Sequence, residues 1–180
     1  QTGIPSYIIK RSLGIPLEPC TATTAYEASE MYGDETDETE QQAAVVERWI
    51  ELLTSAKEAK DMREDLGTSM KGLDILFFKK WLSLCVTLQD FTDLYSNAYD
   101  YDEVAGEIFE RILALTTTTD GAGELYESAG DNQRQAALAK WRVLCKEAID
   151  KATDFESAMQ AYQATPMDDF EICIYGLKKL

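Results

Sequence analysis

Apolar residues recur at steps of three and four along most of this chain, the spacing that places side chains on one face of an α-helix. The longest stripe consists of Leu73, Phe77, Trp81, Leu84, Leu88, Phe91 and Tyr95. Its period is that of a helix and is held for about six turns. The stripe therefore predicts one long amphipathic helix over residues 73–95.

Three further stretches show the same period. They are predicted as a helix over about 38–62, a shorter helix over about 104–115, and a long helix over about 131–162. Their stripes are Val46, Trp49, Leu53 and Ala56; Val104, Ile108, Ile112 and Leu115; and Leu138, Trp141, Cys145, Ala148, Ala152, Phe155, Met159 and Tyr162. The last stripe alternates steps of three and four, which is typical of bundle packing. We therefore expect an all-α fold, an up-down-up-down four-helix bundle.

Capping and breaking residues divide the chain around these helices. Thr24 and Glu27 have the spacing of a capping box that opens a short helix ending at Gly33. A break is predicted at 66–72, a loop with one helical turn at 120–131, and either a short helix or a strand at 170–175. The expected organisation is an N-terminal arm with a short helix over 1–36, a bundle over 37–164 and a C-terminal segment over 165–180. No internal repeat of 20–50 residues is apparent.

The first twenty residues are expected to be extended or irregular, because Pro5, Pro16 and Pro19 disfavour helix. Within this arm lies a short apolar and basic patch, formed by Tyr7, Ile8, Ile9, Lys10 and Arg11. A segment of this size cannot form a core of its own, and another surface is able to order it. We interpret the five patch residues as candidates for binding a protein partner.

The chain is strongly acidic, with 33 acidic and 17 basic residues and a formal net charge of −16. Such a charge repels phosphate backbones and anionic lipid surfaces, so nucleic acid is not expected as a partner. Membrane insertion is not expected either, because no apolar run approaches the length of about 20 residues that spans a bilayer. The partners expected are protein subunits of a larger complex with a basic surface.

Catalytic motifs are missing from the sequence, and it contains no histidine. This removes the commonest general base and the commonest protein metal ligand. No P-loop, dinucleotide fingerprint, nucleophile elbow or EF-hand pattern is present either. Two carboxylate pairs, Asp90 with Asp93 and Glu107 with Glu110, lie off the apolar stripes and are interpreted as solvated. We expect no catalytic residue, no cofactor and no metal.

Four cysteines allow two arrangements. Cys85 and Cys145 lie on or beside apolar stripes, so close helix packing would permit a disulfide between them. Cys20 and Cys173 lie in the two terminal segments, and a second bridge would join the arm to the tail. The alternative is four buried free thiols that behave as small apolar residues. The bridges would fit an organellar lumen or another extracytoplasmic compartment, reached after removal of a targeting segment.

These features favour a non-enzymatic accessory or structural subunit that docks on a larger assembly through its arm. The layout is similar to that of the Q-type extrinsic subunits of photosystem II, in which a proline-bearing arm precedes a four-helix bundle in the thylakoid lumen. The resemblance concerns layout and implies a luminal extrinsic subunit. A secreted four-helix signalling or effector protein is the alternative, followed by a ligand carrier or small enzyme that uses the bundle interior.

Overall fold

The computed structural model describes residues 9, 10, 13, 20–32, 40–67, 73–165 and 170–179. Throughout these ranges the regular secondary structure is helical, with no strand, so the predicted all-α class is confirmed. Contacts group the chain into two compact units, one up to residue 108 and one from residue 109 onward. Each unit is described by itself.

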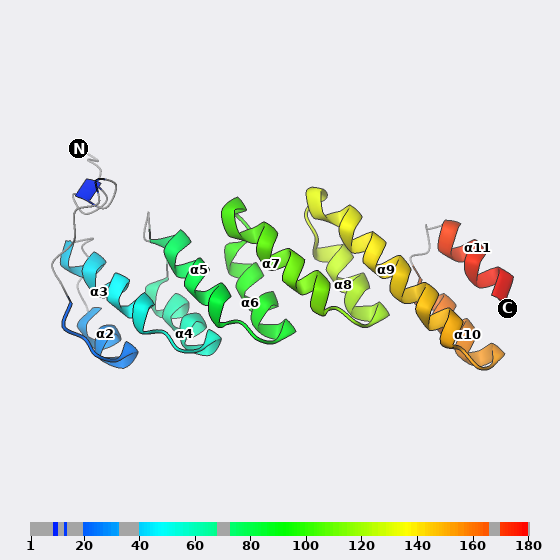
Figure 1. Cartoon of the computed structure of the whole chain (residues 1–180), viewed down its shortest axis with the longest axis horizontal. Coiled ribbons are helices and arrows are strands. Elements are labelled where there is room, and N and C mark those ends of the chain that lie inside the picture. Colours follow the sequence, from blue (N-terminus) through cyan, green and yellow to red (C-terminus); the bar gives the residue numbers. More distant parts are fainter. Residues whose placement is uncertain are drawn as a thin grey trace. The chain divides into compact units, whose positions relative to one another are not determined.

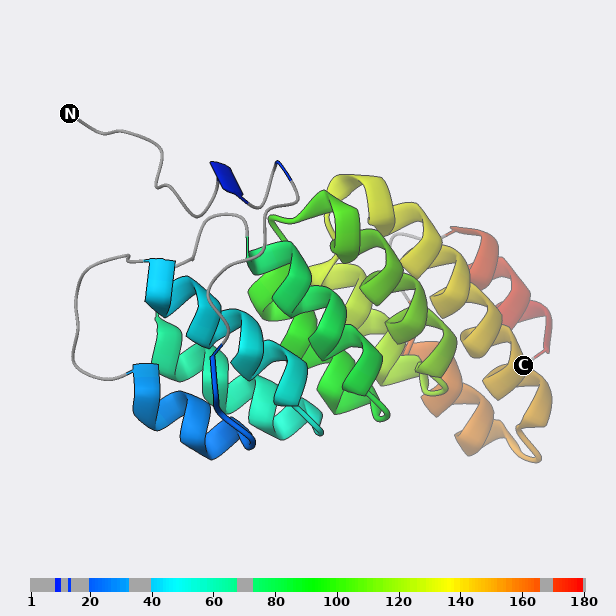
Figure 2. The same ribbon diagram turned by 60° about the vertical axis from the view of Figure 1, so that its left-hand side comes forward.

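The first unit consists of consecutive helices joined by short connections. They are α2 (Ala25–Tyr32), α3 (Glu40–Leu52), α4 (Ala56–Leu66), α5 (Asp74–Leu84), α6 (Leu88–Ala98) and the beginning of α7 (Asp102–Leu115) (Figure 1). Helix α2 packs against α3, α4 against α5, and α5 against α6. Helices also pack on their next-but-one neighbours, α3 beside α5 and α4 beside α6 (Figure 2). This packing buries Trp49, Phe78 and Trp81.

The second unit is organised around one long helix. It contains the end of α7, then α8 (Thr119–Ser128), α9 (Asp131–Lys151), α10 (Phe155–Gln163) and α11 (Phe170–Lys179). Helix α9 packs against α8, α10 and α11. A core cluster of Cys145, Ile149 and Ile172 joins α9 to α11, and Trp141 and Tyr175 pack on it.

Three of the four expected long helices are each two helices. The breaks lie at 53–55, 85–87 and 152–154, so the four-helix up-down topology is not confirmed. At each break an N-cap side chain accepts a hydrogen bond from the backbone N–H three residues later: Ser55 from Glu58 at 3.2 Å, Thr87 from Asp90 at 3.2 Å, and Asp154 from Ser157 at 2.8 Å. Such caps give the backbone an alternative to continuing the helix. The apolar period ran through the breaks in the sequence, but the stripe residues that begin α6 and α10, Leu88 and Phe155, are exposed.

The predicted loop over 120–131 is wrong, because residues 119–128 form α8. Its N-cap is Thr118, whose hydroxyl accepts a hydrogen bond from the N–H of Gly121 at 3.1 Å. Glycine lowers helix propensity, but Gly123 lies where a Cβ would be 3.1 Å from the Trp141 ring. The close approach of α9 thus explains a glycine inside this helix.

Residues 170–175, for which the sequence allowed either a helix or a strand, are helical and belong to α11.

The helices recur with a period that the sequence analysis missed. Helices α2, α4, α6, α8 and α10 begin at residues 25, 56, 88, 119 and 155, which are intervals of 31, 32, 31 and 36. The residue before each of these helices is a capping type: Thr24, Ser55, Thr87, Thr118 and Asp154. Such a spacing is typical of proteins built from repeated helix pairs. The repeat was missed because its members share a cap type and an apolar period but few identical residues.

The caps predict how stability depends on pH. Backbone N–H groups lower the pKa of two carboxyls: Thr54 donates to Glu58 at 2.8 Å, and Thr87 donates to Asp90 at 2.8 Å. A carboxyl whose folded-state pKa is lowered stabilises the fold above its unfolded-state pKa, and this contribution is lost as pH falls through the folded-state pKa. We expect the free energy of unfolding to fall below about pH 4. In the Glu58→Gln, Asp90→Asn double variant this pH-dependent loss should be smaller; an identical pH profile would contradict the assignment.

Candidate functional site

A depression of about 300 Å³ opens between α4, α5 and α6 in the first unit. Charged groups surround it. They are Lys57, Lys60 and Asp61 from α4, and Asp90 and Asp93 from α6; Ala56 and Trp81 complete the lining. Two ammonium and three carboxylate groups therefore meet around one indole.

Helix geometry explains how these side chains converge. Residues 57, 60 and 61 are three and four apart and therefore share one face of α4. The break at 85–87 turns the chain back after Trp81, so that the start of α6 comes to lie beside α4. Asp90 and Asp93, which were interpreted as solvated, are intermediate in exposure and line the depression. The capping signal at Thr87, rather than the apolar stripe, would have revealed this turn.

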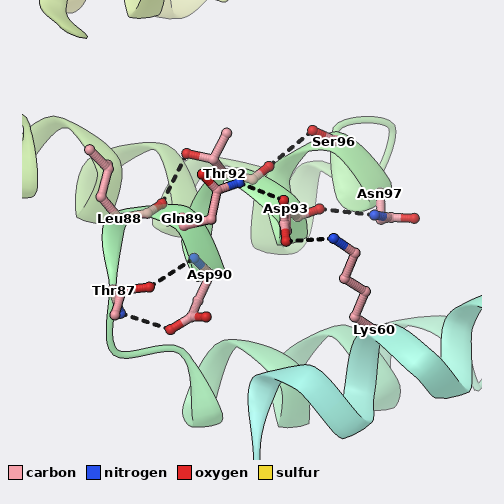
Figure 3. Close-up of polar contacts among 9 residues, drawn as sticks. All are labelled: Lys60, Thr87, Leu88, Gln89, Asp90, Thr92, Asp93, Ser96 and Asn97. Carbon is pink, nitrogen blue, oxygen red and sulfur yellow. Dashed lines mark hydrogen bonds and ion pairs between the residues drawn. The ribbon is translucent and has the colours of Figure 1, made fainter.

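An ion pair joins the two walls of the depression. Lys60 Nζ lies 2.8 Å from Asp93 Oδ2, and Gln89 Nε2 donates to Asp93 Oδ1 at 2.8 Å (Figure 3). The hydrogen bond between Lys60 and Asp93 raises the pKa of the lysine and lowers the pKa of the aspartate. Both groups are therefore charged at neutral pH and satisfy one another.

The Asp90 carboxylate caps the start of α6. Its Oδ2 accepts a hydrogen bond from the N–H of Thr87 at 2.8 Å, and its own N–H donates to the Thr87 hydroxyl (Figure 3). The same Oδ2 accepts from the N–H of Val86 at 3.0 Å. This is a capping box, in which two side chains satisfy backbone donors reciprocally. The carboxylate thus holds the wall of the depression in place.

The indole of Trp81 is not satisfied. Its side chain is 1% exposed, and its Nε1 is the buried side-chain nitrogen or oxygen that lacks a hydrogen-bond partner within the described ranges. Trp141 shows the usual arrangement, because its Nε1 donates to the carbonyl of Ala164 at 3.1 Å. A buried donor left unpaired costs about 1–3 kcal/mol. An acceptor brought to Trp81 would recover this energy.

Two charged residues on α4 are also uncommitted. Lys57 and Asp61 are exposed, and neither forms an ion pair or hydrogen bond with any residue that the structure describes. They are four residues apart, so their side chains project from the same face, with Cβ atoms about 5–6 Å apart. The edge of the depression therefore carries one exposed ammonium and one exposed carboxylate, and the carboxylate of Asp61 interacts electrostatically with Lys60.

The predicted partner-binding patch lies mostly outside the described residues, which omit Tyr7, Ile8 and Arg11. Ile9 is 48% exposed and Lys10 is half-buried. Both residues are helical, and the N–H of Leu13 donates to the carbonyls of both, at 3.1 Å each, so the expectation of a non-helical arm is wrong at these two positions. The role of the patch stays a prediction.

The cysteines are not brought together in the part of the chain that is described. Cys20, Cys85 and Cys145 form no disulfide with one another, and the side chain of Cys173 lies outside the description. Cys85 belongs to the first unit and Cys145 to the second. The thiol of Cys85 donates to the carbonyl of Trp81 at 3.3 Å. Burial, with added repulsion from Asp90 and Asp93, raises the pKa of Cys85 to about 12.

This raised pKa predicts an unreactive thiol, because the thiolate is the reacting form. In the native protein at pH 8, Cys85 should react with iodoacetamide roughly a hundredfold or more slowly than in the urea-unfolded chain. Peptide mapping by mass spectrometry measures the rate for each cysteine. Equal labelling rates in the native and unfolded chains would contradict the expectation.

One measurement tests the two predicted disulfides together. Thiols are counted in the denatured, unreduced protein: four free thiols reject both bridges and remove the support for an oxidising compartment. No free thiol would support both bridges, including the predicted link between Cys20 and Cys173.

One long stretch of the chain is rich in acidic residues and poor in basic ones. Residues 90–131 contain eleven acidic residues and one basic residue, Arg111. On α8, Asp120, Glu124 and Glu127 follow one another at steps of four and three and are all exposed. These residues present one strongly negative helix face.

Within the described ranges, no cluster of three or more histidine, cysteine or acidic side chains is arranged to hold a metal ion. None of the helices searched combines the length and apolarity that a membrane crossing requires. No protein-family model, curated protein or solved structure matches this chain.

Proposed function

We propose that this protein is a non-enzymatic accessory subunit that docks on a larger protein assembly. The observation that supports the proposal is the recurrence of helix pairs at intervals of 31 to 36 residues, of which α2 with α3, α4 with α5, α8 with α9 and α10 with α11 are in contact. In helix-pair repeat proteins each pair packs mainly on its neighbours, and the remaining faces form extended binding surfaces for other proteins.

Charge favours a partner with a basic surface. The stretch 90–131 accounts for ten of the sixteen net negative charges of the chain. Complementary charge steers association and selects partners more than it adds affinity. The apolar and basic patch of Tyr7 to Arg11 supplies a second contact of opposite character, which the acidic body does not provide.

The proposal is tested by affinity capture with the full chain, followed by identification of the bound proteins by mass spectrometry. Specific partners should bind at about 0.05 M salt and be lost progressively above about 0.15 M, where the Debye length is near 8 Å. Replacing Glu110, Glu124 and Glu127 by glutamine should weaken capture. The matched control replaces Glu30, Glu64 and Glu156, which are exposed acids on other helices.

Deletion of residues 1–19 tests the arm. It should abolish capture but leave the far-UV helical signal intact, because the described core begins after these residues. Capture that is insensitive to salt and to both glutamine sets would reject the acidic contact. Capture that survives the deletion would reject the arm.

A further inference from the structure

Helix α11 has apolar side chains on two faces. One face is buried against α9 and α10 and includes Ile172 and Gly176 (Figure 1). The other face carries Ile174, which is 49% exposed, and Leu177, which is 62% exposed. Residues three apart are neighbours on a helix surface, so these two side chains form one exposed apolar pair.

One charge of each sign flanks this pair. Glu171 precedes Ile174 by three residues and Lys178 follows it by four, so both lie on the same side of α11, and both are exposed. Oε1 of Glu171 accepts from Nζ of Lys146 at 2.8 Å, but 63% of the glutamate side chain stays exposed. The outer face of α11 is therefore acidic near its start, apolar in its middle and basic near its end.

We propose that this outer face binds the same face of a second copy of the chain, with the two α11 helices antiparallel. Reversing one helix brings Glu171 of each copy opposite Lys178 of the other, because the midpoint of these two residues falls next to Ile174. Leu177 of each copy then packs on Ile174 of the other. The interface is two-fold symmetric, so each contact is made twice. It is independent of the docking surface proposed above.

Charge favours a second copy at α11. The chain has a net charge of −16, so two copies repel one another wherever their acidic surfaces meet. Helices α9 and α11 carry five and two basic residues and three and one acidic residues, which leaves ten basic and twenty-nine acidic residues for the rest of the chain. Repulsion is therefore smaller at α9 and α11 than over the remainder.

The order of charges also argues for a copy of this chain over another kind of partner. A basic partner, which suits the acidic stretch 90–131, would meet Lys178 beside the apolar pair. An acidic partner would meet Glu171. A second α11 in reverse direction supplies the opposite charge at both positions and an apolar pair between them.

The expected dimer is weak. One helix from each copy makes a smaller contact than the roughly 1,200 Å² at which stable interfaces begin. We expect half of the chains to be dimeric at a concentration of about 10–100 µM.

Sedimentation equilibrium of the full chain over about 1–500 µM measures this association. The average mass should rise with concentration from 20.2 kDa toward twice this value. Leu177→Glu places a charge in the apolar centre and should raise the dissociation constant about a hundredfold or more. The matched control is Val86→Glu, which adds the same charge at a 79% exposed position of the first unit and should leave the constant unchanged. Far-UV circular dichroism checks that both variants keep their helices.

A charge exchange tests the antiparallel direction. Lys178→Glu puts two acids opposite one another at each end of the interface, and Glu171→Lys puts two bases there, so each variant alone should dimerise about tenfold more weakly. An equimolar mixture of the two variants restores opposite charges at both ends. With one variant ¹⁵N-labelled, native mass spectrometry should show the mixed dimer in excess over either dimer of like chains.

Three results would overturn the proposal. They are a mass of one chain at every concentration up to about 500 µM, equal dissociation constants for Leu177→Glu and Val86→Glu, and no excess of the mixed dimer in the charge exchange. A single parent chain at all concentrations would also mean that another protein covers this face. Because these measurements need no other protein, their failure is distinguishable from failure of the docking function.

Discussion

Replacing Phe78 by alanine is expected to lower the free energy of unfolding by about 3–5 kcal/mol. The ring is 0% exposed, and its centroid lies 4.8 Å from that of Tyr101 and 5.3 Å from that of Phe77. The Arg63 guanidinium carbon lies 5.5 Å from the same centroid. Truncation would remove the apolar burial and these ring contacts together and leave a cavity in the first unit.

Urea unfolding followed by tryptophan fluorescence measures the loss. The matched control is Leu76→Ala on the same helix, where the side chain is 37% exposed and truncation should cost much less. A loss of less than about 1 kcal/mol for Phe78→Ala would show that the aromatic cluster does not support the first unit.

Replacing Gly176 by alanine is expected to destabilise the protein by about 1–3 kcal/mol. A Cβ at this position would lie 2.6 Å from Cδ2 of Tyr162 and 3.5 Å from Cδ1 of Ile149. The ring or α11 must move to relieve this contact. Alanine is otherwise the better helix residue by about 1 kcal/mol, so a net loss reports the packing of α11.

Gly106 is the matched control for this substitution. It also lies inside a helix, α7, but a Cβ there would meet no atom within 4 Å. Gly106→Ala should therefore raise the free energy of unfolding by about 0.5–1 kcal/mol. The two alanine variants are expected to change stability in opposite directions in the same denaturation assay. A gain in both would contradict the close approach of α11 to α10.

The sequence alone was sufficient for the class of fold and for much of the core. The period of three and four placed Trp49, Phe77, Trp81, Ile108 and Cys145 on buried faces, and all five are buried. Capping and helix-breaking residues also predicted helix ends correctly, because these residues act on the backbone next to them. Thr24 and Glu27 opened α2 as predicted, and the glycine-containing stretch at 66–72 separates α4 from α5.

The length of each helix depended on whether a capping side chain ended it, and the spacing of apolar residues does not contain this information. A capping residue at 55, 87 or 154 ends one helix and opens another without interrupting the spacing of three and four. The stripe does not stay buried across these breaks, since Leu88 and Phe155, which directly follow two of the caps, are exposed. The opposite error occurred at 119–128. Two glycines and four threonines favoured a loop, but packing against Trp141 made a helix there favourable.

The depression between α4, α5 and α6 forms only because the chain turns at these capping residues. Lys57, Trp81 and Asp90 lie on three helices, and no spacing along the chain relates them to one another. Only the fold-back at 85–87 brings Asp90 beside α4, and only packing leaves the Trp81 indole without an acceptor. The sequence determined which faces are apolar, since that property is local. Tertiary structure decided which polar groups meet, since hydrogen bonding and burial depend on neighbours that are distant in the chain.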